Sequence, residues 1–324
     1  MVVLMLVFVC ETVTGGGMVD EDLPTSLISE GTLMRDTLIG DIEDLPGVRV
    51  ITTHDARLPP PPRGTSTLVH PGDSPWAIWG QLAAGADCCW PIAPETDGIL
   101  EQLTQMLRAR SRRVVACDDA TLRDCASKAR TAQVLERAGV TVVPTWRQGE
   151  VPSGQSGPFI LKPDDGAGAI GVMIFQQLPA EPLPGNTIVQ PLVEGTAASL
   201  ILLCQGGRSY VLAANEQIID DIDGHLHFSG VTVGGLPITE ELRMLGDKVG
   251  AAFPGLHGIV GLDYIVTKDG PVVVEVNPRL TTSYAGLRRS LGINPIAFVA
   301  EFIRDGAIPE LPHMPMPVPV EVRL

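Results

Sequence analysis

Two apolar segments joined by a short turn constrain the fold of this chain most strongly. Residues 258–267 (GIVGLDYIVT) and 271–277 (PVVVEVN) have the apolar content of buried β-strands, and the KDG between them is typical of a hairpin turn. The second segment carries Glu275 and Asn277, and burying such polar groups is costly unless another group compensates. The sequence therefore predicts either a hairpin with a functional polar face or a half-exposed hairpin whose polar side chains face water.

The register of this hairpin decides where its acids lie. Alternation along the second strand places Val273, Glu275 and Asn277 on one face. With a three-residue loop, residues 268–270, Asp263 lies directly opposite Glu275, whereas a two-residue loop would turn Asp263 to the other face. The three-residue register gathers Asp263, Glu275 and Asn277 into an oxygen-rich cluster, which suits Mg²⁺ when phosphates complete its ligand shell.

The net charge limits the partners. The 324 residues carry a formal charge of −15, with an isoelectric point near 4.7. Nucleic acid and anionic membranes reward basic patches, so this acidity argues against both and favours small-molecule chemistry. No stretch of the sequence approaches the roughly 20 apolar residues that a membrane span needs.

The six cysteines indicate a reducing compartment. They form no C-x-x-C pair and lie inside apolar segments, so we expect reduced, structural thiols and a cytoplasmic protein. The apolar opening, MVVLMLVFVC, has no Lys or Arg before it and no small-residue cleavage pattern after it. It therefore predicts a buried first strand rather than a signal peptide.

Residues 1–115 predict an open α/β domain. A strand from Val2 to Cys10, a helix from about Pro24 to Ile42 and further alternating elements favour a mostly parallel sheet. Ligands of such sheets lie at the carboxyl ends of the strands, where Glu11 and the Gly-rich segment Thr14–Gly17 follow the first strand.

Two further domains are expected. Residues 116–189 contain one helix, over about 118–139, and a small lid of short strands and turns rich in Gly and Pro. Residues 190–324 contain further strands, the hairpin described above and a helix from about Asn294 to Asp305. The predicted fold class is α/β, with α+β organisation in the second and third domains.

The segment FILKPDDGAGAIGV has the composition of a phosphate-binding loop. Lys162 ends a predicted strand, and Gly166, Gly168 and Gly171 follow, so backbone N–H groups can approach a ligand without obstruction. It is not a Walker A loop, in which the Lys follows the glycines. A flexible Gly-rich hairpin with a surface lysine is the alternative interpretation.

Two other segments are uninformative alone but indicate a family when their order along the chain is considered. Lys128, in CASKARTAQVL, is by itself an ordinary helical lysine, and QPLVEG, residues 190–195, is by itself a strand and a turn. Taken in sequence, however, Lys128, Lys162 with its Gly loop, QPLVEG, Asp263 and EVNPR resemble the ATP-grasp ligases across the second and third domains.

This resemblance implies a fold and a set of roles. The fold would be ATP-grasp, with an N-terminal open parallel α/β domain, a small lid domain and a C-terminal antiparallel-sheet domain. Lys128 and Lys162 would bind ATP phosphates beneath the Gly166–Gly171 loop. One or two Mg²⁺ ions, or Mn²⁺, would be bound by Asp263, Glu275 and Asn277. The segment for adenine and ribose would consist of Gln190, Pro191, Leu192, Val193 and Glu194.

One departure from the family concerns the ribose. ATP-grasp hinges usually carry an acid at the start and another shortly after it, and here those places hold Gln190 and Ala197. Glu194 is the acid that could reach the ribose hydroxyls instead.

Three segments of the amino-terminal third, together with one segment after the hairpin, resemble one group within this family. VFVCETVTGGGM, SLISEGTLMRDTL, IAPETDGIL and NPRLTTSYAGL are similar to the group that includes tyramine–glutamate ligase, which acts in methanofuran synthesis; related proteins accompany methylofuran and other one-carbon cofactor pathways. The resemblance implies a ligase that activates the γ-carboxylate of glutamate, or of a relative, as an acyl phosphate and transfers it to a tyramine-like amine. The implied substrate side consists of Glu11, Thr14, Gly15, Gly16, Gly17, Asn215 and Arg279.

Such a reaction needs no Ser, Cys or His nucleophile. Positioning and charge neutralisation by Mg²⁺, Lys162 and Arg279 would supply the catalysis. We expect Arg279 to stabilise the acyl phosphate, with a structural salt bridge as its alternative role.

Two other functions stay open. One is an amino-acid or dipeptide ligase of the D-alanine ligase kind, and the other is a nucleotide-binding regulator without turnover, which the missing hinge acids make conceivable. The expected partners are small-molecule amino acids and amines, with no nucleic acid and no membrane, and a homodimer is left open.

Overall fold

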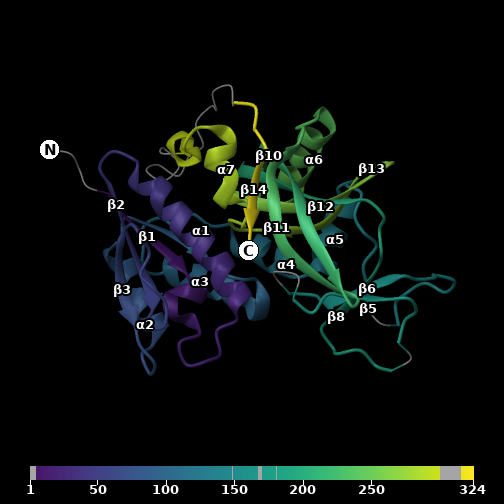
Figure 1. Ribbon diagram of the computed structural model, residues 1–324, viewed down its shortest axis with the longest axis horizontal. Helices are drawn as coiled ribbons and strands as arrows, with labels where there is room; N and C mark the ends of the chain where they lie inside the picture. Colours follow the sequence, from purple (N-terminus) through teal and green to yellow (C-terminus); the bar gives the residue numbers. More distant parts are fainter. Residues whose placement is uncertain (1–4, 148, 167–169, 180, 300–314) are drawn as a thin grey trace.

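The computed structural model of the protein describes residues 5–147, 149–166, 170–179, 181–299 and 315–324. Within these residues the strands form a four-stranded parallel sheet near the N-terminus and a ten-stranded antiparallel sheet in the rest of the chain (Figure 1). The predicted combination of a parallel α/β part and an antiparallel part is therefore confirmed.

The parallel sheet has helices on both faces. Its strand order is β3-β2-β1-β4. On β1, Val7 and Val9 pack into the same core as residues of α1, while Phe8 and Cys10 pack with residues of α2 and α3. This alternation is the reason why the segment is apolar throughout. The elements are β1 (Met5–Glu11), α1 (Thr25–Glu43), β2 (Val48–Asp55), β3 (Thr65–Val69), α2 (Pro75–Gly85), β4 (Cys88–Ile92) and α3 (Ile99–Arg108).

The helix predicted over about 118–139 is two helices, α4 (Asp119–Ala126) and α5 (Lys128–Arg137). Ser127 between them has an extended backbone, and its hydroxyl accepts a hydrogen bond from the Arg130 N–H. A serine is a good N-cap, so it begins a new helix here instead of continuing the old one. The single-helix prediction was wrong, and Lys128 is the first residue of a helix.

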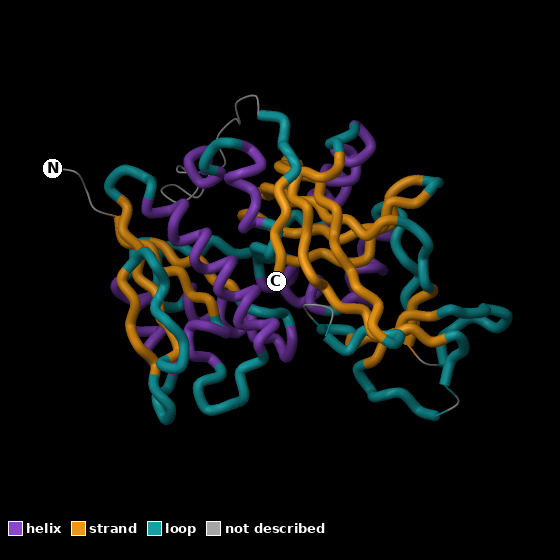
Figure 2. Tube along the Cα trace, viewed as in Figure 1, coloured by secondary structure: helices purple, strands orange, loops and turns teal. Residues whose placement is uncertain are grey.

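The antiparallel sheet is continuous from its large part to the lid. Its order is β13-β12-β9-β10-β11-β7-β6-β8-β5, with β14 also paired to β11. The lid strands β5 to β8 lie at the lower right of Figure 2 and have a small core of Phe159, Leu161 and Val189. The strands are β5 (Trp146–Arg147), β6 (Phe159–Pro163), β7 (Met173–Phe175), β8 (Thr187–Pro191), β9 (Thr196–Gln205), β10 (Arg208–Ile222), β11 (His225–Leu236), β12 (Gly258–Thr267), β13 (Gly270–Asn277) and β14 (Val320–Arg323).

The hairpin β12–β13 has the predicted pairing of Asp263 with Glu275, but its loop length differs from the prediction. Thr267 pairs with Gly270, so the loop has two residues and not three, yet Asp263 still lies opposite Glu275. A bulge at Val274 adds the missing residue and shifts the register. The bulge also corrects the predicted faces: Val273 packs into the core with Val276, whereas Val274 lines the same cavity as Glu275 and Asn277.

Several elements were not predicted or only partly predicted. The sequence analysis missed β3, α6 (Glu240–Ala252) and α7 (Tyr284–Leu291). α6 did carry a signal, since Thr239 is its N-cap and accepts a hydrogen bond from Leu242 N–H. Of the helix predicted from Asn294 to Asp305, a short 3₁₀ turn (Pro295–Val299) is observed, and the remainder lies outside the described residues.

The six cysteines are buried and free. Among the described residues, no helix is long and apolar enough to cross a membrane.

A buried polar contact joins α1 to α7. The Tyr284 hydroxyl donates a hydrogen bond of 2.7 Å to the carboxylate of Asp41, which is also 3.0 Å from Arg288. Both Asp41 and Tyr284 are buried, and burial raises the pKa of Asp41 despite these two partners. The contact fixes the helix of the first sheet against the chain that follows β13.

We expect Tyr284→Phe to destabilise the protein by about 1–2 kcal/mol, because it leaves a buried carboxylate with one donor fewer. Urea unfolding followed by circular dichroism measures this change. Tyr210→Phe is the matched control, since among the described residues the Tyr210 hydroxyl makes no hydrogen bond. Equal unfolding midpoints for Tyr284→Phe and the control would contradict the expectation.

Candidate functional site

One cavity contains the predicted metal ligands and the predicted lysine and arginine residues. It lies where the large sheet, α5, the lid strand β6 and α1 meet. Six charged or polar residues named in the sequence analysis line it: Lys128, Lys162, Asp263, Glu275, Asn277 and Arg279. Its apolar wall is formed in part by Ile170, Ile219, Leu226, Phe228 and Ile265.

Lys128 connects the acids to the Gly loop. Its Nζ lies 3.1 Å from Glu275 Oε2 and donates a hydrogen bond of 2.5 Å to the backbone carbonyl of Gly166. The lysine side chain is 9% exposed and the glutamate side chain 20% exposed, so solvent screens this pair only weakly. The ion pair therefore orients both groups toward the cavity.

The start of α5 is fixed by the segment that follows Lys162. Asp164 is buried, and its carboxylate accepts hydrogen bonds from Ser127 Oγ and Ala129 N–H, while its carbonyl accepts from Lys128 N–H. Arg147 lies 3.0 Å from the same carboxylate. A negative side chain at a helix N-terminus is stabilising, because the N–H groups there have no partner within the helix. This contact fixes the start of α5, which carries Lys128, to the end of β6, which carries Lys162.

Lys162 is buried, and its charge is costly there. Burial lowers the pKa of its ammonium group to about 8; Glu275 acts against this shift and Lys128 adds to it. The lysine is therefore an ammonium group at neutral pH that gains from contact with a further negative group in the cavity.

The two acids of the hairpin differ in their electrostatics. Burial, followed by the neighbouring Glu275 carboxylate, raises the pKa of Asp263 to about 7. Burial also acts on Glu275, but the two lysines prevail and lower its pKa below the ordinary value. The amide groups of Gln217 and Asn277 each donate a hydrogen bond of 3.0 Å to Asp263. Asp263 thus receives its hydrogen bonds from neutral amide groups, whereas Glu275 forms an ion pair with Lys128.

Arg279 has a structural partner that the sequence analysis did not identify. Its Nε lies 3.0 Å from Glu95 Oε1, and its Nη2 donates a hydrogen bond of 3.1 Å to Oε2. Glu95 comes from the IAPETDGIL segment, which follows β4 of the parallel sheet. The predicted alternative, a salt bridge, is present, and it leaves Arg279 in the lining of the cavity.

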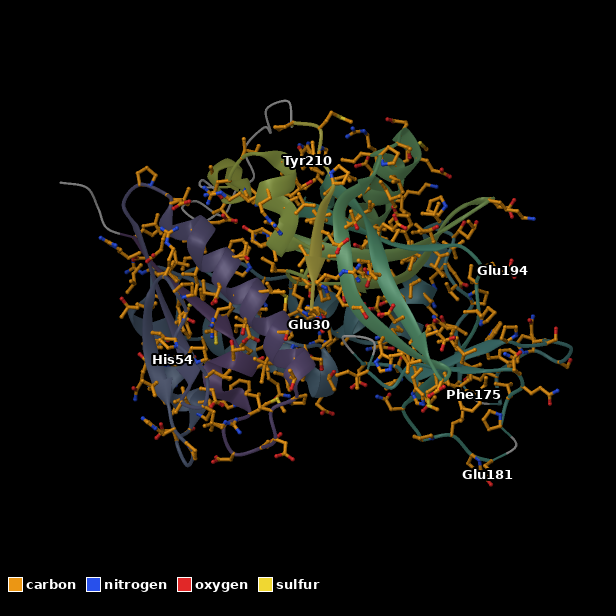
Figure 3. All side chains as sticks on the ribbon, viewed as in Figure 1. Glu30, His54, Phe175, Glu181, Glu194 and Tyr210 are labelled. Carbon is orange, nitrogen blue, oxygen red and sulfur yellow. The ribbon has the colours of Figure 1, made fainter. Side chains whose placement is uncertain are left out.

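Glu30 is a second residue that the sequence analysis missed. It lies on α1, lines the cavity and accepts a hydrogen bond of 3.2 Å from Thr282. Figure 3 shows it where the first helix meets the strands of the large sheet. Its segment, SLISEGTLMRDTL, had been noted as a whole, and no local feature distinguished this acid from the others in it.

The Gly-rich segment after β1 is not part of the cavity lining among the described residues. Glu11 is buried and accepts hydrogen bonds from Val13 N–H and Thr14 N–H, so its carboxylate closes the turn on itself. A Cβ on Gly15 would lie 2.9 Å from Thr53 Oγ1. Gly16 has a positive φ of 97°, and a Cβ on Gly17 would lie 2.6 Å from a backbone oxygen. This packing gives Glu11, Thr14, Gly15, Gly16 and Gly17 a structural function, and their substrate role stays a prediction.

Other predicted residues also lie away from the cavity lining. Asn215 is fully buried between Ser199 Oγ and the Gly234 N–H. Gln190 donates to Thr145 Oγ1, and Leu192 N–H donates to the Pro158 carbonyl. Figure 3 shows Glu194 at the edge of the molecule, away from Glu30. The adenine and ribose roles of Gln190, Pro191, Leu192, Val193 and Glu194 stay predictions, and Gly168 of the Gly loop lies outside the described residues.

Comparisons with known proteins agree with this geometry. The ATP-grasp domain model matches residues 125–283, and the pre ATP-grasp 3 domain model matches residues 48–122. The chain is 25% identical over 201 residues to tyramine–L-glutamate ligase of Methanocaldococcus jannaschii, covering 61% of this chain and 57% of the relative. It is 27% identical over 206 residues to the enzyme of that name from Methanocaldococcus fervens, covering 62% of each. The chain thus spans about three fifths of these curated relatives.

Solved structures show the same fold. An ATP-grasp superfamily protein from Archaeoglobus fulgidus has a TM-score of 0.69 at 22% identity, and the match covers 99% of both chains. Biotin carboxylase from Campylobacter jejuni has a TM-score of 0.73 at 13% identity, covering 96% of this chain and 73% of that one.

We expect Asp263→Asn to stabilise the metal-free protein, and more so at high pH. A carboxyl group whose pKa is raised in the folded state contributes stability below its unfolded pKa of about 4, and this contribution is lost as the pH rises through about 7. Removing the charge should therefore raise the free energy of unfolding by about 2 kcal/mol more at about pH 8.5 than at about pH 5.5.

Urea unfolding in the presence of a chelator measures the difference. Asp269→Asn, in the exposed turn of the same hairpin, is the control and should show no such pH dependence. If Asp263→Asn changes the free energy of unfolding equally at both pH values, burial does not raise the pKa of this carboxyl group.

Proposed function

Because the chain belongs to the ATP-grasp family, we propose that it is an ATP-dependent carbon–nitrogen ligase that forms ADP and joins glutamate to tyramine or a similar amine. Two relatives named tyramine–L-glutamate ligase support this choice of substrates, and so does a third relative, a probable alpha-L-glutamate ligase of Vibrio atlanticus that is 26% identical over 198 residues. The place in methanofuran-type or methylofuran-type cofactor synthesis and a cytoplasmic location are part of the same proposal.

The observation that supports the proposal best is the composition of the cavity. Two lysines, two acids and an arginine, drawn from α5, β6, β12 and the end of β13, line one partly buried space. Phosphoryl transfer depends on positioning and charge neutralisation, and this set supplies both signs of charge without a nucleophilic side chain.

The acids fit a hard divalent cation. Asp263, Glu275 and Asn277 offer oxygen donors, which Mg²⁺ prefers. Burial and then the neighbouring Glu275 carboxylate raise the pKa of Asp263, so a cation entering between the two acids would stabilise their charged forms. Asn277 turns its nitrogen toward Asp263 here, and rotation of the amide would present its oxygen instead. These three residues would bind one or two Mg²⁺ ions.

The cations fit the phosphates and the acyl phosphate. ATP, when bound, supplies the phosphoryl group that activates the substrate carboxylate. Lys128 and Lys162 would bind its phosphates from the lid side of the cavity. Arg279, oriented by Glu95, would neutralise charge on the acyl phosphate.

The direct test is ADP release with Mg²⁺, ATP and a panel of amino acids and amines. We expect release that requires both glutamate and tyramine, together with an amide product of the matching mass. ADP release with D-alanine or another neutral amino acid alone would contradict the proposed substrates and leave the assignment as a ligase in place. No release with any pair, while nucleotide still binds, would favour a regulator.

We expect Glu275→Gln to abolish Mg²⁺-dependent turnover and leave the fold intact. The replacement is nearly isosteric but removes one anionic oxygen from a hard-cation site, so turnover at limiting Mg²⁺ should fall at least about 100-fold. ADP release measures turnover, and circular dichroism measures folding. Glu240→Gln, exposed at the start of α6, is the control. Full activity in Glu275→Gln at limiting Mg²⁺ would remove Glu275 from the metal site.

We also expect ATP affinity in the absence of metal to fall as the pH rises through about 8, because Lys162 then loses its proton. A guanidinium group stays charged, so Lys162→Arg should lose this pH dependence. Equilibrium binding of a fluorescent ATP analogue between about pH 7 and 9 measures the effect. Lys248→Arg, exposed on α6, should behave like the unsubstituted protein. If the ATP affinity of Lys162→Arg still falls over this pH range, the pH dependence belongs to another group.

A further inference from the structure

Glu30 is brought to the cavity by a helix that is fixed on two sides. On one side, Gly31 lies so close to Glu11 that an added Cβ would be 3.0 Å from its carboxylate, and Arg35 donates a hydrogen bond of 2.9 Å to Thr14 Oγ1. On the other side, Asp41 binds Tyr284 and Arg288, as described above. The position of Glu30 is therefore set before any substrate binds, which is the condition for a preorganised site.

The carboxylate of Glu30 keeps one oxygen without a donor. Thr282 donates to Oε2, and among the described residues no donor reaches Oε1. The positive charge of Arg279 acts on Glu30, but the hydrogen bonds of its Nη1 and Nη2 go to the Leu280 carbonyl and to Glu95. A partly buried carboxylate in this state has room for one more hydrogen-bond donor, and a cationic donor would bind most strongly.

Glu30 and the two lysines line the same cavity but come from different elements, Glu30 from α1 and the lysines from α5 and β6. Arg279 interacts with Glu30 and also with Glu275, and Glu275 in turn contacts Lys128. The charge of Arg279 thus acts both on Glu275, which pairs with Lys128, and on Glu30. A cationic group bound to Glu30 would therefore share the cavity with Arg279, the residue proposed to neutralise the acyl phosphate.

We propose that Glu30 binds the ammonium group of the incoming amine and removes one of its protons before the amine attacks. This inference rests on the proposed ligase function. An amine of the tyramine type is almost entirely protonated at neutral pH, since its pKa is close to the lysine value of about 10.4. The ammonium group must lose a proton to become a nucleophile, so the reaction needs a base in the cavity.

The step balances. One N–H bond of the ammonium breaks, and its proton moves to a Glu30 oxygen. The nitrogen lone pair forms the C–N bond with the acyl carbon, and the C–O bond to phosphate breaks with its electron pair on the leaving oxygen. The second proton of the nitrogen leaves with the phosphate. Burial raises the pKa of Glu30, which brings it nearer to the working pH of a general base, while Arg279 and Thr282 act against that shift.

Hydroxylamine distinguishes a general base from a residue that is needed for acyl phosphate formation. It is largely unprotonated at neutral pH, so it attacks the acyl phosphate without a base. With glutamate, ATP and Mg²⁺, the unsubstituted protein should form both the hydroxamate with hydroxylamine and the amide with tyramine. Glu30→Gln should form the hydroxamate at a rate within about twofold of the unsubstituted protein, and the amide about 10²- to 10⁴-fold more slowly.

Two variants complete the test. Glu21→Gln, an exposed acid just before α1, should leave both reactions unchanged. Glu30→Asp keeps the charge on a shorter side chain and should recover part of the amide formation. Loss of both reactions in Glu30→Gln, or loss of neither, would overturn the assignment of Glu30 and leave the ligase proposal in place. Absence of hydroxamate with the unsubstituted protein would overturn the ligase proposal, and this inference with it.

Discussion

The cavity depends on a balance between buried charges of opposite sign. A buried lysine or carboxylate is unfavourable alone, and removal of one partner of a buried pair leaves the other uncompensated. Lys128 and Glu275 lie 3.1 Å apart. The charges of both act on Lys162, and the charges of Glu275 and Lys162 act on Asp263. The balance is incomplete, since the pKa values of Lys162 and Asp263 are both shifted toward the neutral forms. Each of these two groups therefore gains if a counter-charge enters the cavity, and this gain is available for binding a substrate.

The backbone around Asp164 holds two of these charged groups in position. Because its carboxylate and carbonyl bind the first N–H groups of α5, the lid strand β6 and the helix carrying Lys128 are fixed to each other. The next residue, Asp165, accepts hydrogen bonds from Thr96 through its backbone carbonyl and from Asn186 through its carboxylate. The KPDDG segment is thus a junction between the lid, α5 and the loop after β4. This explains how a lid with a small core of its own can still position Lys162.

Sequence reasoning located the charged half of the site because those residues interrupt apolar strands or end them. It assigned Asp263 and Glu275 to opposite positions, but for an incomplete reason: the loop is one residue shorter than expected, and the bulge at Val274 compensates. A bulge has no reliable local signature in an all-valine run, so alternation could not reveal it. Glu95 and Glu30 were missed for another reason. Both are ordinary acids in their own segments, and only the packing of the parallel sheet against the large sheet brings them to Arg279.

The cavity lining therefore comes from different parts of the chain. Lys128, Lys162 and the two acids come from α5, β6 and the hairpin, and their geometry depends on the lysine and acid pairs. Glu30 comes from α1 and lies beside the residues after β13, where Thr282 contacts Glu30 and Tyr284 contacts Asp41. The charge of Arg279 acts on Glu275 of the first group and on Glu30 of the second. Under the proposed function, a change of amine would be accommodated by substitutions on α1 and in residues 281–283 that leave the lysine and acid pairs untouched. By contrast, displacement of Arg279 would disturb both groups at once, which gives a physical reason for its ion pair and hydrogen bond with Glu95.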